Sequence, residues 1–189
     1  MIALLALALA LSNPPSLPGR GNERLAADPA LAARVRDLPV RTNSLSWMLG
    51  GYDIETRTEG AAYPIQGFGY VQNGFGMGWI QLRERYDGFP EQLTFIGYDP
   101  AGQRWRSTTI DRNNDVITLH APSWENGRAV FEGEVSILGE RVQVRRTMTH
   151  LPRVVREGDD DDFSIVEEHR VGGRWRVVTT QHFRGRPVN

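Results

Sequence analysis

The fold is decided by the stretch at residues 92–120, which reads QLTFIGYDPAGQRWRSTTIDRNNDVITLH. It holds three alternating segments rich in β-branched and aromatic residues, separated by two short connectors. The connectors, Asp99 to Gly102 and Arg112 to Asp115, supply residues that preset a tight turn or tolerate a positive φ. Because strands joined by such short turns pair antiparallel, this stretch predicts a meander of hairpins.

The same pattern extends through the rest of the chain, since no stripe of three helical turns appears after Tyr52. It predicts ten strands, at Tyr52–Thr58, Ile65–Gln72, Gly76–Tyr86, Gln92–Tyr98, Arg104–Ile110, Val116–His120, Arg128–Ile137, Arg141–His150, Phe163–His169 and Arg174–Phe183. Ten meandering strands accumulate twist, and an open sheet would leave two edges free to aggregate. We therefore expect an all-β chain that forms a single up-and-down antiparallel β-barrel.

The N-terminal residues have a different character. Met1–Leu11 is an uninterrupted apolar run, too short to span a bilayer but of the length of a signal-peptide core. Ala10 and Ser12 offer a small-x-small cleavage site, although no basic residue precedes the run, and a buried N-terminal helix is the alternative. We assign residues 1–12 to a signal peptide and expect a periplasmic or secreted protein with no integral membrane segment after processing.

Residues 13–43 are predicted to form a linker and a short helix. The linker is rich in Pro, Gly and Ser, and Asp28 with Pro29 then supplies an N-cap and a first helical residue. Apolar residues at helical spacing continue to Leu38, so we expect a short N-terminal helical arm over Pro29–Leu38. The barrel domain is assigned to residues 44–186, and opens with one or two helical turns before Gly50.

Composition excludes several classes of function. The 189 residues suit one domain, and 40% hydrophobic residues with a net charge of -1 indicate a globular protein without a nucleic-acid partner. The absence of cysteine excludes disulfides, thiolate metal sites and a cysteine nucleophile. All 22 basic residues are arginine, which excludes Schiff-base chemistry and a P-loop lysine.

Six spaced features lie between Leu45 and Arg184. They are Leu45–Gly51, the Gly-rich hairpin before Trp79, Gly97–Pro100 leading to Trp105, Val144–Thr149, Asp162–Ile165, and Gly172–Trp175 with Phe183-Arg184. In this order they resemble the DUF1579 group, a bacterial family of unknown function with a lipocalin-like, calycin-type β-barrel. The resemblance implies a barrel with an internal cavity, and it implies no reaction.

The strand at Arg141–His150 carries the main functional signal. Val142, Val144 and Met148 share one face with Arg146 and His150, so the register that buries the apolar side chains also turns Arg146 inward. An inward arginine is costly unless it is paired. Its partner is either the carboxylate or phosphate head of a bound amphiphile, or, in the alternative reading, an internal carboxylate of the barrel or water at the rim.

We therefore expect an exported barrel that binds a small apolar or amphiphilic ligand, partly apolar and able to carry an anionic group. The expected ligand-binding residues are Arg146, His150, Trp79, Trp105, Phe131 and Met148, although the two tryptophans can equally be plain core. One alternative is an enzyme of unknown reaction, which would bring acids, bases or nucleophiles with shifted pKa values together in the cavity. The other is a structural barrel with a filled core.

The four histidines lie at or near the ends of different predicted strands, at His120, His150, His169 and His182. Their spacing matches no metal-binding motif, so no metal and no cofactor is predicted. His182 invites comparison with haem-binding nitrobindin-like barrels, which use a histidine near the C-terminus. It alternates out of phase with the bulky row of Trp175, Val177 and Phe183, which weakens that comparison.

Overall fold

The computed structural model describes residues 29–30, 33, 45–74, 79–137, 139–152 and 161–186. The chain divides into two compact units, residues 1–37 and 38–189. In the first unit Pro29, Ala30 and Ala33 are helical, and the rest of the expected helical arm lies outside the described residues, as does the expected signal peptide. The arm and the signal peptide therefore stay predictions.

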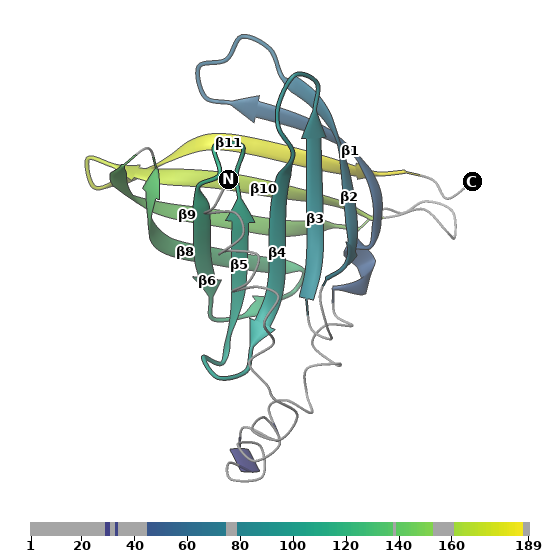
Figure 1. Ribbon diagram of the computed structural model, residues 1–189, viewed down its shortest axis with the longest axis vertical. Coiled ribbons are helices and arrows are strands. Elements are labelled where there is room, and N and C mark those ends of the chain that lie inside the picture. Colours follow the sequence, from purple (N-terminus) through teal and green to yellow (C-terminus); the bar gives the residue numbers. More distant parts are fainter. Residues whose placement is uncertain are drawn as a thin grey trace, which may run out of the picture. The chain divides into compact units, whose positions relative to one another are not determined.

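The second unit is a closed antiparallel β-barrel (Figure 1). Its elements are η1 (Ser46–Met48), β1 (Gly50–Thr58), β2 (Ile65–Asn73), β3 (Trp79–Tyr86), β4 (Gln92–Asp99), β5 (Arg104–Ile110), β6 (Val116–Ala121), β7 (Trp124–Glu125), β8 (Arg128–Ile137), β9 (Glu140–Leu151), β10 (Asp162–Val171) and β11 (Arg174–Gly185). Strands β1 to β6 pair in sequence order, as do β8 to β11, and β11 returns to pair with β1. The pairing of His120 in β6 with Glu132 in β8 closes the barrel.

All ten predicted strands are present, which confirms the all-β barrel. The observed strands start or end within a few residues of the predicted bounds, although residues 75–78 of the third predicted strand lie outside the described part of the chain. The additional strand β7 was missed because it is only two residues long and therefore has no alternation to detect.

The two ends of the barrel differ. Since successive strands run in opposite directions, the β1–β2, β3–β4, β5–β6, β8–β9 and β10–β11 connections lie at one end, which we call the hairpin end. The other end is plugged by η1, where Leu45 and Met48 are fully buried. The hydroxyl of Tyr52 donates to the Met48 carbonyl at 2.8 Å and ties this plug to β1.

Large apolar side chains fill the half of the barrel next to η1. Phe163 of β10 and Phe183 of β11 stack with ring centroids 4.1 Å apart, and Tyr52 meets the Phe163 ring edge-on. Two inward-facing glycines in β2 make room for neighbours: a Cβ at Gly67 would lie 2.6 Å from Cδ1 of Tyr86, and one at Gly69 would lie 2.9 Å from Cδ1 of Ile54. The packing of Tyr86 thus depends on the absence of a side chain at Gly67.

Candidate functional site

Arg146 lies inside the barrel, as the alternation of β9 predicted. It is 6% exposed, and its inward neighbours Val144 and Met148 are buried while Arg145 faces outward. Its Nε and Nη2 donate to Oε2 of Glu167 at 3.1 and 2.5 Å, and its Nη1 donates to Oγ1 of Thr109 at 2.6 Å. The arginine is therefore paired with an internal carboxylate on the neighbouring strand, the arrangement that the sequence left open as the alternative.

Glu167 also faces inward and is held from two sides. Its Oε1 lies 3.0 Å from Nε2 of His169, two residues further along β10. Burial opposes ionisation of this carboxyl, but the charge of Arg146 and the hydrogen bonds from His169 and Arg146 outweigh it and lower the pKa of Glu167 to about 2. Glu167 is thus ionised at neutral pH.

A second carboxyl, Glu84 of β3, is buried deeper, at 1% exposure. Its Oε1 accepts a hydrogen bond from Nε2 of Gln92 at 3.0 Å, and its Oε2 accepts from Nε2 of Gln181 at 2.6 Å and from the Tyr86 hydroxyl at 3.1 Å. Burial raises the pKa of Glu84 in spite of these donors and of the charge of Arg146. Burial and the neighbouring Glu84 likewise raise the pKa of the Tyr86 phenol.

These side chains belong to one interior polar cluster. Its members are Thr56 of β1, Glu84 and Tyr86 of β3, Gln92 and Thr94 of β4, Thr109 of β5, Arg146 of β9, Glu167 and His169 of β10, and Gln181 of β11. Thr94 and Thr109 share a hydrogen bond of 3.0 Å, and the Tyr86 and Thr56 hydroxyls lie 2.8 Å apart. Several members nearer the hairpin end, among them Gln92 and His169, are only half-buried, so solvent reaches the cluster.

The other predicted ligand-binding residues lie in three places: the apolar core, the outer face of β3 and, for His150, the end of the barrel next to η1. Trp105, Phe131 and Met148 are buried and face inward, on the apolar side of the cluster. Trp79 is half-buried on the outer face of β3, where the Arg106 guanidinium lies 4.7 Å from its ring centroid. The placement of Trp79 around the interior was wrong, because it is out of phase with the inward-facing Ile80.

His150 does not join the interior polar cluster. It shares the inward face of β9 but lies at the η1 end, where its ring stacks on Trp47 with centroids 3.9 Å apart. Its Nε2 lies 2.7 Å from Oδ2 of Asp161. His150 therefore contributes to the plug, beside a group of edge-on contacts between Trp47, Trp124 and Trp105.

The sequence reasoning missed the carboxylates of the cluster, although a signal for them was present. Glu84 is in phase with Ile80 and Leu82 along β3, so the alternation that buries the aliphatic residues also buries Glu84. Glu167 is in phase with Phe163 and Ile165 along β10 in the same way. A polar residue within an apolar row of a strand is the feature that identifies both.

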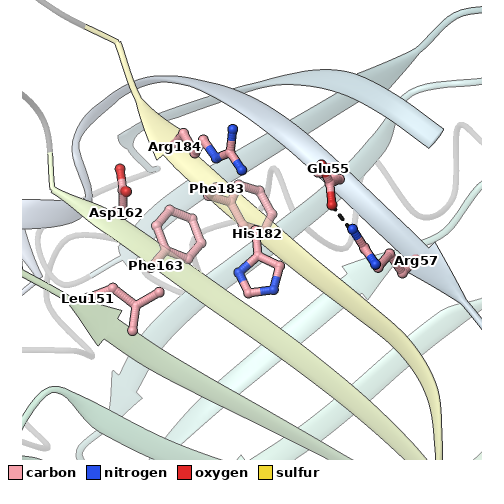
Figure 2. A pocket seen from close by; sticks show the side chains of 8 residues that line it. All are labelled: Glu55, Arg57, Leu151, Asp162, Phe163, His182, Phe183 and Arg184. Atoms are coloured by element: carbon pink, nitrogen blue, oxygen red, sulfur yellow. Dashed lines mark hydrogen bonds and ion pairs between the residues drawn. The ribbon is translucent and has the colours of Figure 1, made fainter. Parts of the chain in front are cut away.

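A hollow of about 280 Å³ lies on the outer wall over β1, β10 and β11 (Figure 2). It is lined by Glu55, Arg57, Leu151, Asp162, Phe163, His182, Phe183 and Arg184. His182 is exposed on the outer face of β11, with Phe183 buried beside it. His182 therefore points away from the interior, which removes it as a ligand for a cofactor held inside the barrel.

Within the described ranges, no group of three or more His, Asp or Glu side chains is arranged to hold a metal ion. None of the described helical segments has the length and apolar character needed to cross a bilayer.

A scan against protein-family models and a search of curated proteins both return no match. The resemblance to the DUF1579 group therefore stays a prediction.

Proposed function

We propose that the protein is an exported, lipocalin-like barrel that binds a small amphiphilic molecule in its interior. The apolar part of the molecule would lie against the core near Trp105, Phe131 and Met148, and its polar part against the interior polar cluster. The observation that supports this is the convergence of polar side chains from opposite walls of the barrel, next to an apolar core and within reach of solvent. A barrel that served only as a scaffold would gain more stability from apolar residues at these positions.

The polar group of the ligand is constrained by the pairing of Arg146. An anionic head group, as expected from the sequence, would have to share or replace the contact between Arg146 and Glu167. A neutral group that donates and accepts hydrogen bonds, such as a hydroxyl or an amide, needs no such exchange. We therefore favour a neutral polar group, with an anionic one as the competing possibility.

Probe binding tests the proposal. A dansyl-labelled undecanoic acid and the corresponding alcohol are titrated into the purified protein, and the blue shift of dansyl emission reports uptake. We expect uptake of both probes, with the alcohol bound at least as tightly as the acid. If Arg146 anchors an anion, the Arg146→Met variant should bind the acid probe about 10- to 150-fold more weakly and the alcohol probe unchanged. This factor corresponds to about 1.5–3 kcal/mol for a hydrogen bond to a charged group. If the wild-type protein takes up neither probe, the barrel is structural and the binding proposal fails.

One observation favours an enzyme as a second candidate. Glu84 and Glu167 share the interior, yet the pKa of Glu84 is raised and that of Glu167 is lowered. Two carboxyls whose pKa values are shifted in opposite directions are suited to act as acid and base in proton transfer. Incubation in D₂O with small molecules that co-purify, followed by mass spectrometry, would show deuterium uptake by a substrate. The Glu84→Gln variant should abolish that uptake, whereas a carrier shows no deuterium uptake in either protein.

The proposal that the protein is exported is supported by the apolar run Met1–Leu11. N-terminal sequencing of protein from a periplasmic extract should begin near Asn13. Recovery of intact Met1 from the cytoplasmic fraction would contradict export and leave the binding site unaffected.

A further inference from the structure

The end of the β10–β11 hairpin separates from both neighbouring strands. Strand β11 pairs with β1 only as far as Thr179, and β10 pairs with β9 only as far as His169. Apart from Val178, whose carbonyl accepts a hydrogen bond from the Glu59 N–H, the residues between them pair with each other around a two-residue turn in which Gly172 and Gly173 have φ of 59° and 79°. In Figure 1 this turn is at the far left, beyond the β8–β9 turn. We call residues 170–177 the hairpin tip.

The hairpin tip combines exposed apolar side chains with arginines. Val171 and Val177 are 52% and 47% exposed. Arg174 and Arg176 are also exposed and make no hydrogen bond or ion pair with any described residue, while Arg170 has a single long contact, from its Nε to the Gly173 carbonyl at 3.5 Å. The pairing of the hairpin places Val171 with Arg174 and Arg176 on one face, and Val177 with Arg170 on the other, so each face combines an exposed valine with positive charge.

The acidic residues of the same hairpin do not neutralise these arginines. Glu167 is paired with Arg146 inside the barrel, and Glu168 accepts two hydrogen bonds of 2.7 Å from Arg145. Glu59 shares a surface hollow with Arg176 but forms no ion pair with it in the described structure. Within the described part of the chain, the three arginines of the hairpin tip therefore have no ion-pair partner, on a protein whose net charge is -1.

We propose that the hairpin tip docks the barrel on an anionic lipid surface. The arginines match the negative charge of the head groups, and the valines can enter the interface between head groups and acyl chains. The hairpin tip lies at the hairpin end, where members of the interior polar cluster are half-buried, so docking brings this end of the barrel to a membrane from which an amphiphile can be taken. The transfer step rests on the proposed binding function, whereas docking itself does not.

Flotation with lipid vesicles tests the docking. The full chain is mixed with vesicles of phosphatidylcholine alone, or of phosphatidylcholine and phosphatidylglycerol at 3:1, and the floated fraction gives the affinity. We expect binding to the mixed vesicles that weakens with salt. The triple variant Arg170→Gln/Arg174→Gln/Arg176→Gln should bind about 100-fold more weakly, because each arginine near an anionic surface contributes about fivefold.

A matched control changes three exposed arginines elsewhere, at Arg83, Arg104 and Arg128, to Gln, with the same effect on net charge. It should float like the wild type, and both variants should melt near the wild-type temperature. A second variant, Val171→Ser/Val177→Ser, keeps the charges and should lose about tenfold in affinity through lost apolar burial.

Three outcomes would overturn the docking proposal. The first is a wild-type protein that does not float with the mixed vesicles, and the second is an equal loss in the control. The third is a valine variant that binds as well as wild type. Binding would then be purely ionic, and the partner of the hairpin tip would be a soluble polyanion instead of a membrane. Probe uptake is measured without vesicles, so the two proposals can be told apart. Flotation without probe uptake would contradict the binding function alone. Probe uptake without flotation would contradict the docking alone.

Discussion

Arg146 of β9 and Glu167 of β10 face each other across adjacent strands inside the barrel, with Arg146 Nη2 2.5 Å from Glu167 Oε2. The side chains are 8% and 19% exposed, so the pair is largely removed from water. Taking two charges out of water costs free energy that their attraction only partly returns. The pair is therefore better explained by what it orients, Thr109 and His169, than by a net gain in stability.

Breaking the pair on one side should be more harmful than removing it altogether. Arg146→Met leaves Glu167 buried without its cation, and Glu167→Leu leaves Arg146 without its anion, so we expect each to lower the free energy of unfolding by about 3 kcal/mol. The double variant should lose about 1 kcal/mol, because neither charge is then left alone. Urea unfolding measures all three values, and additive losses would contradict the internal ion pair.

The exposed pair Arg141 with Glu134 provides the comparison. Its side chains are 85% and 47% exposed, with Nη1 3.2 Å from Oε1. Removal of either charge there should change the free energy of unfolding by less than ~0.5 kcal/mol, since surface ion pairs contribute little.

Glu167 should also make the protein sensitive to acid. Its pKa in the folded protein is about 2, below the ordinary 4.5. A lowered folded pKa gives stability that is present above the unfolded pKa and is lost as the pH falls from about 4.5 towards 2. Wild type should therefore lose more stability over this range than Glu167→Gln, as thermal melts at stepped pH values would show. Parallel pH profiles would mean that Glu167 does not carry the effect.

Glu84 should act in the opposite direction. Because its folded pKa is raised, the neutral form is favoured in the folded state, and the associated stability is present below pH 4.5 and is lost as the pH rises through the folded pKa. Glu84→Gln keeps the shape and cannot ionise. We expect the free energy of unfolding of this variant, relative to wild type, to increase as the pH is raised above 4.5. A difference that stays constant with pH would show that Glu84 has an ordinary pKa.

The register of β9 could be predicted from the sequence because Val142, Val144 and Met148 share one phase, and the inward position of Arg146 followed from it. The partner of Arg146 could not, because alternation within one strand does not say which residue of another strand lies opposite. Trp79 lies on the outer face although it is bulky, because its phase along β3 differs from that of Ile80.

Trp175, Val177 and Phe183 of β11 were expected to share one face, and this expectation was wrong for a different reason. The pairing of β10 with β11 shifts register between Glu167 and Glu168, so residues on the two sides of this irregularity no longer keep one phase. Phe183 is buried, whereas Val177 is exposed. A bulge of this kind leaves no clear mark in the sequence, and the exposure of Val177 could not be predicted.

The position of Tyr86, and through it of Glu84, should depend on Gly67. A Cβ at this position would lie 2.6 Å from Cδ1 of Tyr86 and 2.7 Å from the Arg85 carbonyl oxygen, and a backbone atom cannot move away as a flexible side chain can. Gly67→Ala should therefore lower the free energy of unfolding by about 1–3 kcal/mol, the usual cost of overpacking. Gly51→Ala is the control, because its nearest contacts would be ordinary ones, at 3.7–3.9 Å from Phe68 and Arg186. Equal losses of stability in the two variants, measured by urea unfolding, would show that the close approach of Tyr86 to β2 is not what requires glycine at position 67.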